Sequence, residues 1–89
     1  MITKNIPASL ETLAQDGVID YANRWERIGF LGWVSKWEIA FYCCVTPAHA
    51  HDCLENLYAK GKIQRRDRME FGSVCGYEYH PLDKRSVAK

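Results

Sequence analysis

Basic side chains gather in one short segment of the chain, and anion binding is the chemistry that they could perform. The segment contains Lys60, Lys62, Arg65, Arg66 and Arg68, and the only acidic residue among them is Asp67. The 89 residues carry a net charge of +1, but the imbalance is local. Residues 1–59 contain four Lys or Arg and seven Asp or Glu (−3), whereas residues 60–89 contain eight and four (+4). A nearly neutral protein with this asymmetry can present one anion-binding face.

A helix with two unlike faces is predicted just before the basic segment. Thr46 and Pro47 indicate its start, because Thr is a favoured N-cap and Pro is tolerated at the first helical position. It should run to Lys60 and end at Gly61, which suits the C′ position. One face carries apolar residues at helical spacing, namely Ala50, Cys53, Leu54, Leu57 and Tyr58. The opposite face, predicted to be exposed, carries Ala48, Asp52, Asn56, Ala59 and Lys60, with His49 and Glu55 at its margins.

The segments before this helix are predicted to be mostly helical. Residues 35–38 have the pattern of a capping box, so a helix should run from Lys36 to about Cys44. Helices are also expected between residues 7 and 29, where Gly17 would act as a stop between two of them.

A β-hairpin is predicted after the last helix. Residues 62–69 alternate weakly in polarity, residues 74–79 have a strand-like composition, and the segment between them supplies a turn. Pro81 should end the second strand, and residues 83–89 are expected to form a loose tail. A brief strand also fits residues 32–34.

The chain is expected to form a single domain over residues 1–89. It contains no apolar run of roughly 20 residues and no signal-peptide pattern, which favours a cytoplasmic protein. Its cysteines are therefore expected to be reduced, with Cys43, Cys44 and Cys53 as small core residues.

The sequence lacks the patterns of the common catalytic and metal sites. The spacing of its Cys and His residues matches no familiar zinc site, so neither a metal nor another cofactor is expected. It also has no Gly-rich phosphate loop and no nucleophile motif, so we expect no enzymatic activity.

Several residues after Glu38 follow a familiar order. An Ile-Ala pair precedes a hydrophobic residue and Thr at a turn, and two Leu, a Gly, an Ile and a basic pair follow. These residues are Ile39-Ala40, Val45-Thr46, Leu54, Leu57, Gly61, Ile63 and Arg65-Arg66, with residues 76–81 as a return strand. The order resembles the winged-helix branch of helix-turn-helix DNA-binding domains. The resemblance implies an α+β fold, with N-terminal helices (7–29) before a winged unit (35–81) that has a three-helix core and a C-terminal β-hairpin wing.

The resemblance also implies a function. It indicates a small transcription regulator of a phage or other mobile element that binds double-stranded DNA. The recognition helix 47–60 would enter the major groove, and the wing 62–79 would lie on the phosphate backbone. The residues implied to contact DNA are Lys36, Thr46, Ala48, His49, Asp52, Asn56, Lys60, Lys62, Gln64, Arg66 and Arg68. Among them, Asn56 could pair with adenine and His49 could donate to guanine, whereas Arg65 is expected to cover the core.

Protein partners are also predicted. Aromatic residues are abundant in the N-terminal half, and exposed aromatic side chains mark protein interfaces, so a homodimer through this half is expected. The alternative is a protein–protein interaction module on a winged-helix scaffold that has lost DNA binding. The −3 balance of residues 1–59 and the acidic Asp52 and Glu55 favour this alternative. His51, beside Tyr58, is expected to pack rather than to function.

Overall fold

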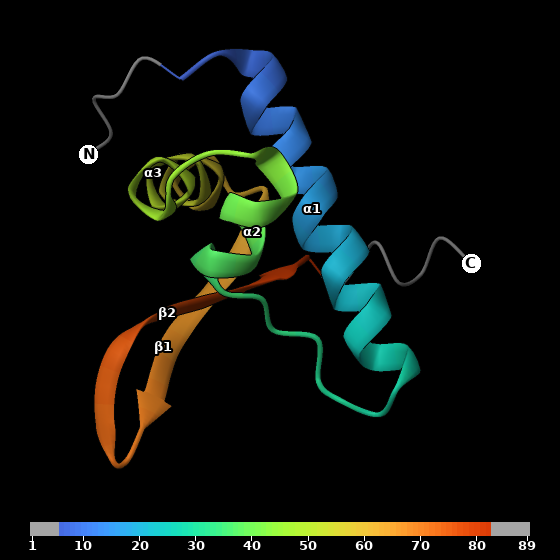
Figure 1. The fold of residues 1–89 in the computed structure, drawn as a ribbon, viewed down its shortest axis with the longest axis vertical. Coiled ribbons are helices and arrows are strands. Elements are labelled where there is room, and N and C mark those ends of the chain that lie inside the picture. The colour runs from blue at the N-terminus through green and yellow to red at the C-terminus, as the bar shows by residue number, and fades with distance from the viewer. Residues whose placement is uncertain (1–5, 83–89) are drawn as a thin grey trace.

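Three helices pack together beside a β-hairpin in the computed structural model, which describes residues 6–82 (Figure 1). In chain order the elements are α1 (Ala8–Arg27), α2 (Lys36–Cys43), α3 (Pro47–Ala59), β1 (Ile63–Glu70) and β2 (Ser73–Pro81). The fold is therefore α+β, and its layout is compatible with a winged helix. The expected tail, residues 83–89, lies outside the described residues. None of the helices within residues 6–82 is both long and apolar enough to cross a lipid bilayer.

α1 is one continuous helix, so the prediction that Gly17 separates two helices is wrong. Gly17 is buried against α2, where an added Cβ would lie 2.9 Å from Cδ1 of Tyr42 and 3.1 Å from Cδ1 of Ile39. The missing side chain allows the two helices to approach closely, and this packing offsets the roughly 1 kcal/mol that a helical Gly costs relative to Ala. Residues 6–82 therefore form three helices, without separate N-terminal helices before a three-helix core.

Short-range signals set the ends of α2 and α3 where the sequence predicts them. The N–H of Ser35 donates to the Glu38 carboxylate at 2.8 Å, which is part of the expected capping box. The hydroxyl of Thr46 accepts the N–H of His49 at 3.2 Å, as expected for an N-cap. Gly61 follows α3 with φ of +74°, a conformation that Gly adopts more easily than other residues.

The hydrophobic core lies between the three helices and the base of the hairpin. Its buried apolar residues are Ala14, Val18, Ala22, Val34, Ile39, Ala40, Cys43, Ala50, Cys53, Leu54, Leu57, Ile63 and Tyr79. The predicted apolar face of α3 is therefore confirmed for four of its five residues. Tyr58, the fifth, is exposed at the edge of this face.

Two of the three cysteines assigned to the core are buried there. Burial raises the pKa of the Cys43 thiol, and it raises the pKa of Cys53 to about 11, so both thiols stay protonated near neutral pH. Cys44 is exposed and ends α2 with φ of 59°, so its predicted place in the core is wrong.

The predicted hairpin is confirmed, and β1 and β2 pair in antiparallel register with one shift between Asp67 and Met69. Figure 1 shows the far end of this hairpin lying clear of the helices. Val34 joins the sheet at the hairpin base. Its N–H donates to the carbonyl of Tyr79 at 2.8 Å, and the Tyr79 N–H donates back at 2.7 Å. The strand expected at residues 32–34 is thus reduced to a single bridge.

Candidate nucleic-acid interface

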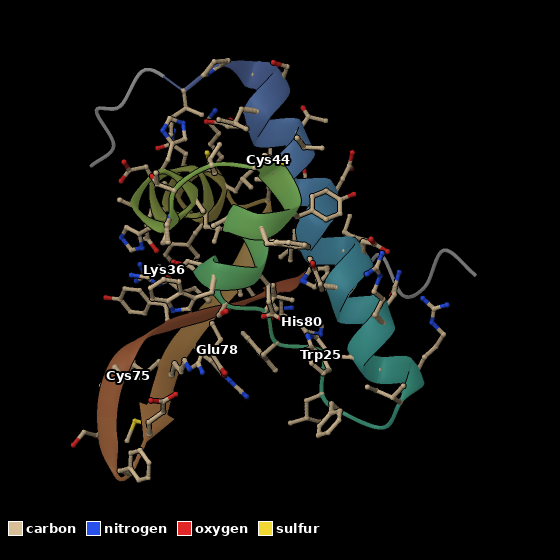
Figure 2. The ribbon with its side chains drawn as sticks, viewed as in Figure 1. Trp25, Lys36, Cys44, Cys75, Glu78 and His80 are labelled. Atoms are coloured by element: carbon tan, nitrogen blue, oxygen red, sulfur yellow. The ribbon has the colours of Figure 1, made fainter. Side chains whose placement is uncertain are left out.

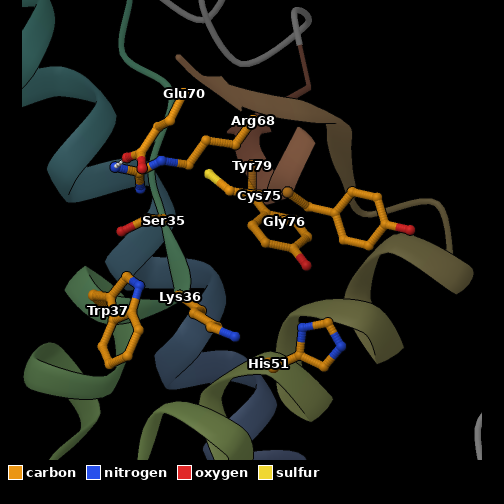
Figure 3. Close-up of a pocket in the computed structure, with 10 residues that line it drawn as sticks. Ser35, Lys36, Trp37, His51, Arg68, Glu70, Cys75, Gly76 and Tyr79 are labelled. Carbon is orange, nitrogen blue, oxygen red and sulfur yellow. Dashed lines mark hydrogen bonds and ion pairs between the residues drawn. The ribbon is translucent and has the colours of Figure 1, made fainter. Parts of the chain in front are cut away.

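A groove of about 150 Å³ opens between the start of α2, the first half of α3 and the hairpin (Figure 3). α2 contributes Lys36 and Trp37, α3 contributes His51, and the hairpin contributes Arg68 and Tyr77. Figure 3 shows Lys36 and His51 at the same opening, although they come from different helices. The groove combines basic side chains with aromatic rings, and it also contains Glu70, which pairs with Arg68 at 2.9 Å. Basic and aromatic groups together suit a phosphate-bearing ligand.

The start of α3 is the second part of the candidate interface. Thr46, Ala48 and His49 are exposed there, whereas Asp52, one turn further along, is half-buried. The first amides of a helix and the positive end of its dipole favour an anion. Since His51 of the same helix lines the groove, this helix end and the groove are adjacent.

Asn56 does not belong to the exposed face of α3, so its predicted role in reading adenine is wrong. The residue is only 4% exposed, and its Nδ2 donates to Oε2 of Glu11 at 2.9 Å. Its Oδ1 is buried without a hydrogen-bond partner among the described residues. α1 therefore covers Asn56, whereas Ala48, Ala59 and Lys60 of the same predicted face remain exposed.

Glu11 is the centre of a polar cluster that joins α1 to the end of α3. The Lys60 ammonium donates to Oε1 of Glu11 at 2.6 Å, so Lys60 holds the fold rather than being a free cation. This hydrogen bond lowers the pKa of the nearly buried Glu11 carboxyl against the opposing effect of desolvation. The hydrogen bond from Asn56 and the charge of Lys62 lower the pKa of Glu11 further.

Arg65 joins α3 to the hairpin, in line with its predicted place over the core. Its guanidinium lies between the rings of Tyr58 and Tyr77, 4.1 Å from each ring centroid, and forms an ion pair with Glu55. The hydroxyl of buried Tyr79 donates to the same Glu55 carboxylate at 2.6 Å. Burial and this carboxylate raise the pKa of Tyr79, so its hydroxyl remains a donor.

Three other polar residues predicted on the hairpin surface also have partners. Arg66 pairs with Glu78 at 2.7 Å and stacks 4.2 Å from the Trp33 ring centroid. Gln64 donates to the carbonyl of Pro81 at 2.9 Å. Arg68 pairs with Glu70 at 2.9 Å, and Lys62 is exposed. Residues 62–81 hold four Lys or Arg and three Asp or Glu, a balance of +1, so the hairpin is less cationic than its basic run alone indicates.

No protein-family model matches this chain, and no curated protein or solved structure is significantly similar to it. Within residues 6–82, no three His, Cys, Asp or Glu side chains gather as a metal site would require.

Some residues of the interface were not indicated by the sequence. His51 lines the groove, although its position beside Tyr58 predicted simple packing. Trp25 donates its ring N–H to Oε2 of Glu38 at 2.6 Å, which ties the start of α2 to α1 (Figure 2). The sequence held no signal for either residue, because His49 and His51 are two positions apart and such residues do not share a helix face.

Proposed function

We propose that this protein binds double-stranded DNA as a small winged-helix regulator of transcription. In this proposal α3 is the recognition helix in the major groove, and the hairpin is the wing on the phosphate backbone. The observation that carries it is the groove in which Lys36, His51 and Arg68 meet beside the exposed start of α3. A DNA groove with its flanking phosphates requires such convergence of basic side chains and a helix end.

The exposed residues at the start of α3 have distinct proposed roles. Ala48 and His49 approach base edges, where the His49 ring can donate to guanine. The Thr46 hydroxyl accepts the N–H of His49 and can donate its own hydrogen to a phosphate, next to the amide of Ala48. Asp52 can only accept, so it favours the amino group of cytosine. The proposed interface does not include Asn56, Lys60 and Gln64, because their polar groups form hydrogen bonds within the fold.

The proposed phosphate contacts come from Lys36, Lys62, Arg66 and Arg68. The ion pairs of Arg66 and Arg68 with their glutamates are partly exposed, so water competes with the carboxylates for the guanidinium groups. Exposed ion pairs contribute only about 0–1 kcal/mol to stability. A phosphate can therefore replace the carboxylate at small cost. No catalytic step forms part of the proposal.

Replacing both Lys62 and Arg66 with Ala should weaken binding to every duplex sequence. Each lost phosphate contact reduces the slope of log affinity against log salt by about 0.9, so the double variant should lose about 1.8. Fluorescence anisotropy of a labelled random-sequence duplex, titrated at several salt concentrations, measures this slope.

The matched control is the double variant Arg24→Ala and Arg27→Ala, which removes the same charge from the exposed end of α1. Its slope should stay close to that of the wild type. Equal losses in both double variants would mean that net charge alone drives binding. A wild-type chain that does not bind duplex at low salt would contradict the proposal outright.

The proposal includes a homodimer, because one copy offers few phosphate contacts. Ile28, Phe30 and Leu31, between α1 and α2, are exposed apolar side chains and form the candidate pairing surface. We expect sedimentation equilibrium to give twice the mass of the chain and Leu31→Lys to return the monomer. A wild-type monomer at the concentrations that saturate DNA would refute the pairing.

One observation favours a second candidate, a protein-interaction module on the same scaffold. The guanidinium groups of Arg65, Arg66 and Arg68 all pair with carboxylates, while Trp37 and Phe41 of α2 are 61% and 78% exposed. Exposed aromatic side chains are enriched in protein interfaces. Absence of duplex binding together with a stable, folded chain would favour this candidate over the first.

A further inference from the structure

The turn of the hairpin contains a residue that the fold does not need. Phe71 and Gly72 connect β1 to β2, with φ of +52° and +81°. Positive φ is unfavourable for a bulky residue, and Asn or Asp before Gly is the usual solution for such a turn. The Phe71 side chain is completely exposed, so its ring adds no packing to the fold. A residue that costs stability without an internal benefit indicates a role outside the fold.

Two more apolar side chains flank Phe71. Met69 and Val74 lie opposite each other in the strand register, and each is 57% exposed. We call Met69, Phe71 and Val74 the apolar tip. Glu70, within this segment, is paired with Arg68 at 2.9 Å, so the charges next to the tip balance.

The pairing of the strands changes where the apolar tip begins. The register shifts between Asp67 and Met69, and Gly76 on the partner strand has φ of +132°. Bulges of this kind bend a β-ribbon and redirect its end. Figure 1 shows that this end of the hairpin is free of the three helices.

Two arginines lie behind the apolar tip, and the spacing of the nearer one is close to the depth of a DNA groove. A strand rises about 3.4 Å per residue, so Arg68 lies roughly 10 Å and Arg66 roughly 17 Å behind Phe71 along β1. The minor groove of DNA is about 7.5 Å deep. With Arg68 on a phosphate at the groove rim, the Phe71 ring reaches the base pairs, and Arg66 lies further from the groove.

We propose that the apolar tip is a wedge that enters the minor groove, opens a base step and bends the duplex. This inference rests on the proposed DNA binding and adds a second activity to it. Apolar side chains inserted between base pairs unstack them and kink DNA, and pyrimidine–purine steps yield most easily. An uncharged tip with arginines behind it complements a duplex, in which apolar stacked bases lie between charged phosphates.

The test compares Phe71→Asn with Phe71→Trp on a duplex that carries a dye at each end and 2-aminopurine at a central TA step. We expect the wild-type chain to increase energy transfer between the dyes and to brighten 2-aminopurine as it unstacks. Phe71→Asn should abolish both signals, whereas Phe71→Trp should keep them. Affinity should fall less than about tenfold in Phe71→Asn, because the phosphate contacts remain. Asn tolerates positive φ, so this variant should melt at the same temperature as the wild type or higher.

Each contrary outcome has a distinct meaning. Wild-type binding without bending, or bending that survives in Phe71→Asn, overturns the wedge and leaves the proposed DNA binding intact. No duplex binding by the wild type overturns both. Phe71-dependent binding to vesicles of mixed phosphatidylcholine and phosphatidylglycerol, without duplex bending, identifies a lipid surface as the partner of the tip and also overturns the wedge.

Discussion

Leu54→Ala is expected to lower the free energy of unfolding by about 3 kcal/mol. Leu54 is fully buried on the face of α3 that packs into the core. Its truncation removes favourable burial and leaves a cavity that the neighbouring helices fill only in part. A domain of this length has a total stability of about 5–10 kcal/mol, so the variant should lose a large share of it. Urea denaturation followed by tryptophan fluorescence measures the change.

Leu13→Ala is the matched control for this prediction. Leu13 lies on α1 and is 39% exposed, so the same truncation removes less buried surface and creates no enclosed cavity. Ala is also the best helix former, which offsets part of the loss. We expect a cost of about 0.5 kcal/mol. Equal destabilisation by the two variants would show that Leu54 is not a core residue, and that α3 does not pack with this face against the core.

The sequence predicted those parts of the fold that depend on neighbouring residues. Ser35 and Glu38 lie three positions apart, and Thr46 caps an amide three positions on, so both helix starts could be recognised locally. The apolar face of α3 and the hairpin followed from periodicity in the same way. These signals act within one or two turns of chain, and the structure confirms them.

Two errors on the helices involve contacts between residues far apart in the chain. Asn56 has the spacing of an exposed residue, but Glu11 lies 45 positions away and accepts its hydrogen bond. Periodicity shows that a helix has an apolar face, yet it does not show that a second helix will cover a polar one. Gly17 is similar, because only the approach of Tyr42 distinguishes a packing glycine from a helix stop.

The hairpin shows why a run of basic residues in the sequence does not reveal how many of them lack an ion-pair partner. A two-residue turn with regular pairing would place Tyr77 opposite Arg66. The bulge shifts the register by one, so Glu78 is opposite Arg66 and forms an ion pair with it. A bulge has little sequence signature beyond a glycine such as Gly76, and the pairing of this arginine was therefore hidden. The sequence located the basic segment, but it did not reveal the ion pairs that its arginines form.

Glu11→Gln is expected to lower the free energy of unfolding by about 2 kcal/mol at neutral pH. The amide would still accept a hydrogen bond from Asn56, but it would lose the attraction to Lys60 and present a donor toward the ammonium group. The half-exposed Lys60 side chain limits the loss, because water takes over part of its solvation. Asp16→Asn, at an exposed position of the same helix, is the control and should change stability little.

The effect of Glu11→Gln should disappear in acid, and this pH dependence separates a charge effect from a packing effect. The pKa of Glu11 in the folded protein lies below its ordinary value of 4.5, so the folded state binds this proton less readily than the unfolded state. The resulting stability is complete above the ordinary value and is lost as the pH falls through the lowered pKa. Urea midpoints of wild type and variant should therefore converge once the wild-type carboxyl is protonated. A difference of the same size at neutral and acid pH would mean that shape, and not the charge on Glu11, joins α1 to the end of α3.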